Sequence, residues 1–88
     1  MAEANLEIKN RLGLHLRAAS TLAQALKPFT STVTLEMDGR KANARSVVNL
    51  ITLGAGIGTK LHVKVEGADA EATLKAVRDL FEQRFGED

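Results

Sequence analysis

A histidine and an arginine stand two residues apart in the segment Gly13-Leu14-His15-Leu16-Arg17, where a turn is followed by a helical pattern. The start of a helix offers unpaired backbone amides and the positive end of the helix dipole, and both favour a bound anion such as phosphate. A neutral imidazole is a nucleophile, and a guanidinium hydrogen-bonds phosphoryl oxygens. These residue types predict that His15 attacks phosphorus while Arg17 stabilises the phosphoryl group.

A histidine near a helix start also has an ordinary interpretation, because such a side chain often only caps the helix or contacts water. Other residues form no second site of this kind. His62 alternates with lysines, which predicts a solvated side chain. Without cysteine or a carboxylate cluster near either histidine, we expect neither a metal site nor a cofactor. The glycine-rich segment 54–58 precedes a strand and matches no nucleotide-binding spacing, so we expect a flexible connection there.

Alternation of apolar and polar residues predicts the strands. They are a short strand around residues 5–9 and strands over residues 32–37, 40–44 and 59–66. Between the second and the third strand stands Asp38-Gly39, a dipeptide favoured in tight hairpin turns.

Helical spacing of apolar residues predicts helices over residues 16–27 and 47–53 and a last helix after Asp69. Pro28 ends the first of them, while Ser46 and Asp69 are the expected N-caps of the second and third. The buried face of the last helix is expected to contain Leu74, Val77, Phe81 and Phe85.

The resulting order, βαββαβα, belongs to the α+β class. Strands with one apolar face need a cover on one side only, and the helices can supply it. We therefore expect a two-layer open-faced sandwich, with the helices on one face of the sheet and the other face solvated. No linker or internal repeat divides the chain, so residues 1–88 are expected to form a single domain.

Composition narrows the class of partner. With 44% hydrophobic and 26% charged residues the chain should fold, and without cysteine it must do so by packing alone, as suits a reducing cytoplasm. A formal net charge of +1 and only three aromatic residues, all Phe, argue against nucleic acid as a partner.

The sequence shows neither a secretion signal nor an apolar run of membrane-spanning length. We expect a cytoplasmic monomer.

Several of these features together resemble the HPr phosphocarrier family. They are the segment from Gly13 to Arg17, Ser46 within Ala-Arg-Ser-Val-Val-Asn-Leu at residues 44–50, the Leu53-Gly54 step, and the βαββαβα order over nearly the whole chain. The usual family motif reads Gly-Leu-His-Ala-Arg-Pro-Ala. Here Leu16 replaces the first alanine and Ala18 replaces the proline, and the bulkier Leu16 is expected to alter which partner docks.

The resemblance implies a function for the pair. The histidine that corresponds to His15 accepts a phosphoryl group from phospho-enzyme I and passes it to a IIA domain of the bacterial phosphotransferase system, and Arg17 inherits the stabilising role. The protein would then be a carrier, modified by enzymes and not itself an enzyme. The resemblance also implies an antiparallel four-stranded sheet of order 1-4-2-3 with the helices on one face.

A docking patch is expected beside His15, because the short second helix is apolar around most of its circumference and a two-layer fold should leave part of it exposed. By geometry and by similarity to the family, this docking patch consists of Leu16, Arg17, Ser20, Val47 and Ile51. The alternative is that loops or a tighter core cover these side chains.

Ser46 has two interpretations of comparable weight. Its hydroxyl is suited to cap the second helix, which is a structural role. The resemblance adds a regulatory one, since in some family members an HPr kinase phosphorylates this serine. Phosphate at this position would add negative charge beside the docking patch.

Other functions are compatible with the same residues. Within the family, the sugar branch competes with the nitrogen-related branch known as NPr. From another class, a regulatory binding module could keep the fold and act by docking to a kinase, a transcription factor or a metabolic enzyme. A ferredoxin-like metal or small-molecule binder ranks last, because the sequence offers no set of ligand residues.

Overall fold

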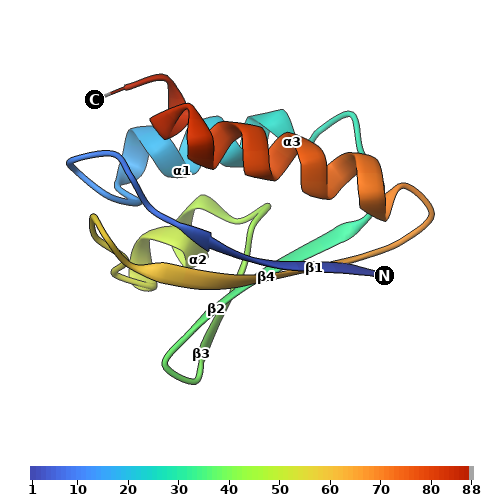
Figure 1. Ribbon diagram of the computed structural model, residues 1–88, viewed down its shortest axis with the longest axis horizontal. Helices are drawn as coiled ribbons and strands as arrows, with labels where there is room; N and C mark the ends of the chain where they lie inside the picture. Colours follow the sequence, from blue (N-terminus) through green and yellow to red (C-terminus); the bar gives the residue numbers. More distant parts are fainter. Residues whose placement is uncertain (88) are drawn as a thin grey trace.

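The computed structural model describes residues 1–87, and within them the predicted order of strands and helices is confirmed (Figure 1). The elements are β1 (Ala2–Glu7), α1 (Leu16–Ala25), β2 (Thr32–Met37), β3 (Arg40–Asn43), α2 (Val47–Thr52), β4 (Lys60–Glu66), α3 (Ala70–Glu82) and a 3-10 turn, η1 (Arg84–Gly86). Most predicted boundaries hold to within two residues, and β1 begins earlier than its alternation indicated. The pairing of β1 with β4 starts at Ala2, opposite Val65, so the partner strand extends β1 beyond its own sequence pattern.

The strands form one antiparallel sheet of order β1-β4-β2-β3, as the family resemblance implied. β2 and β3 are joined by the predicted tight hairpin, in which Met37 pairs with Arg40. Asp38 and Gly39 both have positive φ, at 51° and 78°, the backbone that favours Asp-Gly in such turns. No helix within residues 1–87 is long and apolar enough to cross a membrane.

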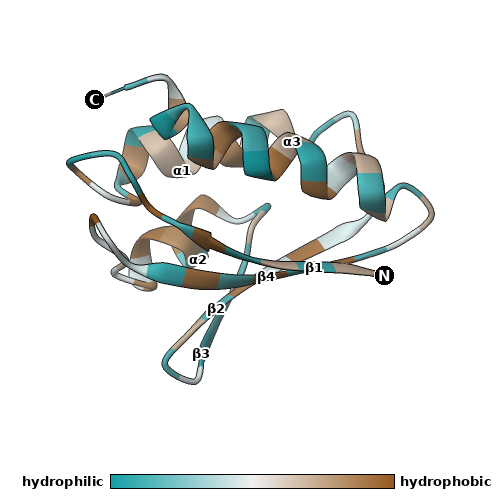
Figure 2. Cartoon of the chain, viewed as in Figure 1, coloured by the Kyte–Doolittle hydropathy of each residue, from teal (hydrophilic) through white to brown (hydrophobic). Residues whose placement is uncertain are grey.

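Helices cover one face of this sheet, so the predicted open-faced sandwich is confirmed. α1 and α3 lie side by side over the strands, and α2 packs next to α1 and β3 (Figure 1). The brown, hydrophobic positions of α1 and α3 lie toward the sheet in Figure 2, while teal positions lie outward. β4 shows the alternation directly, because Leu61, Val63 and Val65 are fully buried while the polar residues between them are exposed or half-buried. Of the expected buried face of the last helix, Phe85 is buried but lies in η1, beyond the end of α3.

Asp69 corrects one expectation. It stands at the N-cap position of α3, yet its carboxylate makes no side-chain capping bond. The carboxylate accepts hydrogen bonds from the backbone amides of Thr30 (2.8 Å) and Ser31 (2.9 Å), and also from the Ser31 hydroxyl. Asp69 therefore ties the segment between α1 and β2 to the start of α3, because two amides and a hydroxyl outweigh a single capping bond.

These contacts make the stability of the fold sensitive to acid. The hydrogen bond from the Ser31 side chain, followed by that from the Thr30 amide, lowers the pKa of Asp69 from 3.8 to about 2. A carboxyl group with a lower pKa in the folded than in the unfolded chain stabilises the fold above the unfolded pKa, and this contribution is lost as pH falls through the folded pKa.

We expect Asp69→Asn to lower the melting temperature at pH 7, and the difference from the native protein to shrink between about pH 4 and pH 2. Thermal unfolding followed by circular dichroism across this range measures the difference. Asp79→Asn is the matched control, because the Asp79 side chain forms an exposed ion pair with Lys75, a kind of contact that contributes little to stability. If the melting temperatures of Asp69→Asn and the native protein differed as much at pH 2 as at pH 6, the stabilising role of the ionised Asp69 carboxylate would be contradicted.

Candidate functional site

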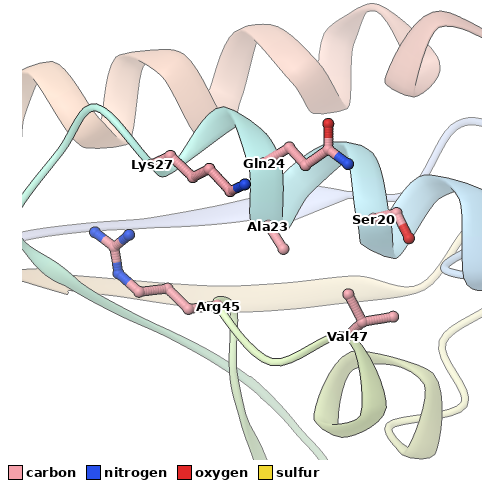
Figure 3. Close-up of a pocket in the computed structure, with 6 residues that line it drawn as sticks. All are labelled: Ser20, Ala23, Gln24, Lys27, Arg45 and Val47. Carbon is pink, nitrogen blue, oxygen red and sulfur yellow. The ribbon is translucent and has the colours of Figure 1, made fainter.

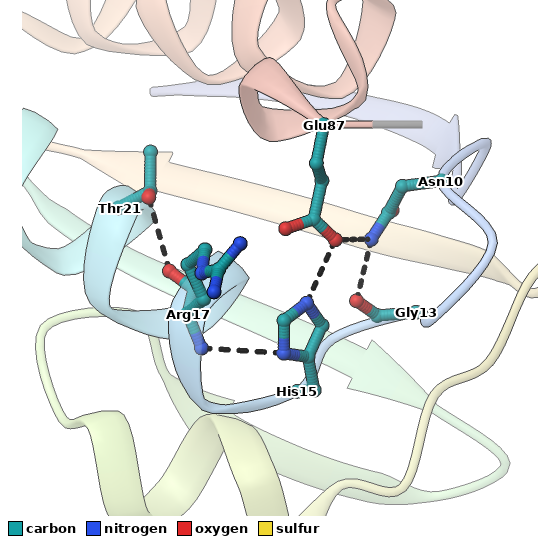
Figure 4. A network of polar contacts seen from close by, with 6 residues as sticks. All are labelled: Asn10, Gly13, His15, Arg17, Thr21 and Glu87. Carbon is teal, nitrogen blue, oxygen red and sulfur yellow. Dashed lines mark hydrogen bonds and ion pairs between the residues drawn. The ribbon is translucent and has the colours of Figure 1, made fainter.

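His15 caps helix α1 with its own ring. The backbone amide of Arg17 donates to Nδ1 of His15 at 3.3 Å (Figure 4). The amide of Ala19 donates to the His15 carbonyl at 2.8 Å. The helix therefore begins at Leu16, as predicted, with an imidazole nitrogen where a serine or aspartate oxygen would be usual. The His15 side chain keeps 29% of its surface exposed, so it remains within reach of another molecule.

The loop before His15 is held by a close backbone approach. The amide of Leu14 donates to the carbonyl of Ala55 at 2.9 Å. Gly13 has a φ of +70°, and a Cβ atom on it would lie 2.5 Å from the Ala55 carbonyl oxygen and 2.7 Å from Cα of Gly56. The glycine-rich segment, expected only to connect two elements, thus supports the loop that carries the histidine.

Glu87 is a member of the site that the sequence did not indicate. Its Oε1 atom lies 2.7 Å from Nε2 of His15 and accepts a hydrogen bond from Nδ2 of Asn10 at 2.9 Å (Figure 4). Asn10 is fully buried and also donates to the carbonyl of Gly13 at 2.6 Å. The side-chain hydrogen bond from His15, and then that from Asn10, lowers the pKa of Glu87. No local pattern links a glutamate to a histidine 72 residues earlier.

Charges of both signs flank the His15 ring. Arg17 has an exposed side chain in the first turn of α1, and with Arg11, Leu12 and Glu87 it lines a shallow pocket of about 240 Å³. The arginines offer donors to an anion, while the carboxylate faces the ring nitrogen. The arrangement can place a nucleophilic nitrogen, free cationic donors and helix amides around one phosphoryl group.

The structure brings part of the docking patch together around His15. His15, Leu16, Arg17 and Ser20 line one open hollow with Leu12. Leu16 is 63% exposed, and Ile51 on α2 is 41% exposed, as a docking role requires.

Val47 differs from the rest of the patch, because it is half-buried and packs against the core. It lines the groove between α1 and α2 with Ser20 and Ala23 (Figure 3). Its neighbour Val48 is 69% exposed. In a six-residue helix that is apolar on most sides, spacing alone does not tell which valine faces inward.

Ser46 is the predicted cap of α2, since its hydroxyl oxygen accepts from the amide of Asn49 at 3.2 Å. The preceding Arg45 was not singled out by the sequence. Its guanidinium donates to the carbonyls of Leu26 (2.8 Å), Phe29 (2.7 Å) and Ser31 (2.8 Å). Arg45 therefore joins the start of α2 to the end of α1 and the segment that follows it.

The second histidine lies apart from this site, on the open face of the sheet. His62 contacts Glu3 at 2.6 Å through Nε2 and Asn5 at 3.0 Å through Nδ1, so it is paired with neighbouring strand residues where solvation alone was expected. Across residues 1–87, no three His, Cys, Asp or Glu side chains are grouped so that they could hold a metal ion.

Known proteins share both the sequence and the structure. Residues 2–83 match the family described as "PTS HPr component phosphorylation site". The phosphocarrier protein HPr of Xylella fastidiosa strain Temecula1 is 41% identical over 88 residues, which are 100% of this chain and 99% of that protein. The solved structure of HPr-C-His from Thermoanaerobacter tengcongensis has a TM-score of 0.94 at 40% identity and covers 100% of this chain and 99% of that one. An HPr dimer from the same organism has a TM-score of 0.78 at 40% identity, with 99% and 100% coverage.

The contact at Gly13 predicts a difference between two glycines. A left-handed backbone costs an alanine about 1–2 kcal/mol, and forced overlap with packed atoms adds about 1–3 kcal/mol. Gly13→Ala should incur both costs. Gly58→Ala should incur only the first, because Gly58 has a φ of +83° and no atom within 4 Å of the added Cβ. Urea denaturation of both variants measures the difference, and equal losses of stability would show that Gly13 is not under steric constraint.

Proposed function

Because the chain belongs to the HPr family, the phosphocarrier proteins of the phosphotransferase system, we propose that His15 is the residue that carries its phosphoryl group and that Arg17 stabilises it. The protein is a carrier and not an enzyme. One observation carries the assignment to His15: the half-exposed imidazole lies at the N-terminus of α1, with Nδ1 facing the Arg17 amide. Phosphate is favoured at such a helix end.

The transfer step uses few groups of this chain. A lone pair on the His15 ring forms the bond to phosphorus, and the bond between phosphorus and the donor breaks with its electron pair leaving on the donor. The Arg17 amide, now bonded to the ring, then becomes free to donate to a phosphoryl oxygen. The exposed Arg17 guanidinium adds a permanent cation in the first turn of α1. Positioning and charge stabilisation are the main sources of catalysis in phosphoryl transfer.

The partners of this step are proposed to be phospho-enzyme I as donor and a IIA domain as acceptor. Both would meet the docking patch, one after the other. The exposed Leu16 and Ile51 offer apolar contact, and Arg17 offers charge. Leu12, which lines the same hollow as His15, and Val48 on α2 are exposed apolar side chains as well.

We propose that the chain acts as a single-domain monomer in the cytoplasm. The absence of cysteine suits a reducing compartment. For the monomer, the support is that the four strands of the sheet and the helices that cover it all come from residues of one chain.

Intact-mass analysis after incubation with phosphoenolpyruvate and enzyme I tests the assignment. We expect one acid-labile phosphoryl group on the native protein, none on His15→Ala, and a rate about a hundredfold lower for Arg17→Ala. His62→Ala is the matched control and should be phosphorylated normally, because His62 lies on the opposite, open face of the sheet. Phosphorylation of folded His15→Ala would reject His15 as the carrier residue.

The same experiment separates the branches. Leu16, 63% exposed beside His15, replaces the usual alanine of the family motif, and this favours a changed partner as the second candidate. If only a nitrogen-branch enzyme I phosphorylates the protein, we assign the protein to the nitrogen-related branch. If neither donor charges a folded protein, and His15→Ala keeps every partner interaction, the regulatory binding module replaces the carrier.

Ser46 is proposed as a regulatory phosphorylation site for an HPr kinase. Its hydroxyl is half-exposed at the start of α2, directly before Val47 of the docking patch. A phosphoryl group there carries close to two negative charges at neutral pH. The docking patch presents the positive charge of Arg17 to its partner, and a negative charge beside it would offset that attraction, so the modification should weaken docking of enzyme I.

Two variants test this effect without loss of the cap. Ser46→Asp and Ser46→Asn both keep a capping oxygen, but only the first adds a charge. We expect Ser46→Asp to accept phosphate from enzyme I about fivefold more slowly at low salt, and the difference to shrink at high salt. Ser46→Asn should behave like the native protein. A native rate for Ser46→Asp at low salt would remove the regulatory role.

A further inference from the structure

The chain returns to the site after α3. In η1 the residues Arg84 and Phe85 have φ values of 56° and 55°, a left-handed backbone that side chains of this size rarely adopt. The Phe85 ring is buried, with its centroid 5.0 Å from that of Phe81, and η1 contacts α1. This anchored turn, red in Figure 1, brings Glu87 beside His15.

Two donors hold the Glu87 carboxylate, and both are themselves fixed. Oε1 faces Nε2 of His15 at 2.7 Å and Nδ2 of Asn10 at 2.9 Å, and only 15% of the Glu87 side chain is exposed. Asn10 is held in turn by its bond to the carbonyl of Gly13. The hydrogen bonds from His15 and Asn10 lower the pKa of Glu87, so the group is ionised at neutral pH.

The two contacts of the His15 ring require the same tautomer. An ionised carboxylate can only accept a hydrogen bond, so Nε2 must carry the proton that it shares with Glu87. The Arg17 amide can only donate, so Nδ1 must present a lone pair. A neutral imidazole satisfies both as the Nε2–H tautomer alone.

We propose that Glu87 is a positioning residue of the phosphoryl transfer: it holds the His15 ring as the Nε2–H tautomer, leaves Nδ1 as the attacking nitrogen, and balances the charge that the ring acquires. This inference rests on the proposed function, in which His15 carries the phosphoryl group. It assigns a role to the C-terminal turn, which the sequence had placed only as part of the last helix.

The charge balance of phosphoryl transfer to His15 gives Glu87 a second role, which is to stabilise the charge on the ring. The Nδ1 lone pair forms the bond to phosphorus, and the donor leaves with the electron pair of the bond that breaks. Nε2 keeps its proton throughout, so the phosphorylated ring is positively charged. The Glu87 carboxylate, 2.7 Å from Nε2, stabilises that charge as the carboxylate behind the histidine of a catalytic triad does. Arg17 faces the negative charge on the phosphoryl oxygens.

Nitrogen NMR of the ¹⁵N-labelled, unphosphorylated protein measures the tautomer directly, at alkaline pH where an imidazole is neutral. The variants are Glu87→Gln, which keeps an acceptor without the charge, and Glu87→Ala, which removes both. We expect the ratio of Nε2–H to Nδ1–H to fall about fivefold to tenfold in Glu87→Gln, and further in Glu87→Ala. Glu71→Gln is the matched control, because it removes the same charge from an exposed position on α3.

Transfer from enzyme I supplies the second readout. The rate should fall about tenfold in Glu87→Gln and stay native in Glu71→Gln, while backbone spectra show all proteins folded. In the native phosphoprotein, phosphorus should be attached to Nδ1. Attachment to Nε2, or a tautomer ratio and rate in both Glu87 variants equal to those of the control, would overturn the inference.

The two readouts distinguish a failure of the proposed function from a failure of the positioning role of Glu87. The tautomer is measured without a phosphoryl donor, so a shift in the ratio supports the positioning role even if no protein is charged, whereas absence of charging rejects the proposed function. If His15 is charged and neither the rate nor the tautomer ratio differs among the variants, the proposed function stands and the role of Glu87 is rejected.

Discussion

Helix α1 begins with a ring nitrogen as its cap, and the rest of the site depends on this contact. The bond from the Arg17 amide to Nδ1 of His15 is 3.3 Å long, beyond the usual range of an N–H donor in a protein. Such a bond orients the ring but costs little to break. A phosphoryl group on Nδ1 would take the lone pair and offer an oxygen to the same amide, so the helix would exchange one acceptor for a charged one. Helix formation and the proposed phosphoryl binding would thereby share a single donor, the Arg17 amide.

Neither the loop nor the helix could hold this geometry alone. Two contacts fix the loop before His15. Gly13 packs closely against the backbone of Ala55, and the Asn10 side chain donates a hydrogen bond to the Gly13 carbonyl. The ring is held from its far edge by Glu87, which the buried Phe85 anchors. These supports come from separate parts of the sequence, and the two-layer arrangement makes them neighbours because α1 packs against both α2 and α3.

What the sequence could predict followed from local chemistry. Alternation marked the strands, Asp38-Gly39 marked the hairpin, helical spacing marked the start of α1, and the same spacing with a capping serine marked the start of α2, since each depends on residues a few positions apart. What it could not predict depends on long-range competition. Asp69 bonds to the backbone of a loop 38 residues earlier in place of the free amides of its own helix, and Glu87 reaches His15 only through a left-handed turn that its residue types do not favour. Family resemblance supplied the strand order, which no local pattern contains.

The opposite charges beside His15 would suit its proposed role as a residue that gives up what it accepts. A site with arginines alone would bind the phosphoryl group tightly and hinder its release. With Glu87 at the other edge of the ring, a phosphoryl group on His15 would have its oxygens stabilised by one charge and the ring nitrogen by the other, while carboxylate and phosphoryl group would repel each other. The repulsion between the two acidic groups would then offset part of the attraction. Such a balance would keep the transfer close to reversible, which is the condition for one exposed histidine to serve a donor and an acceptor in turn.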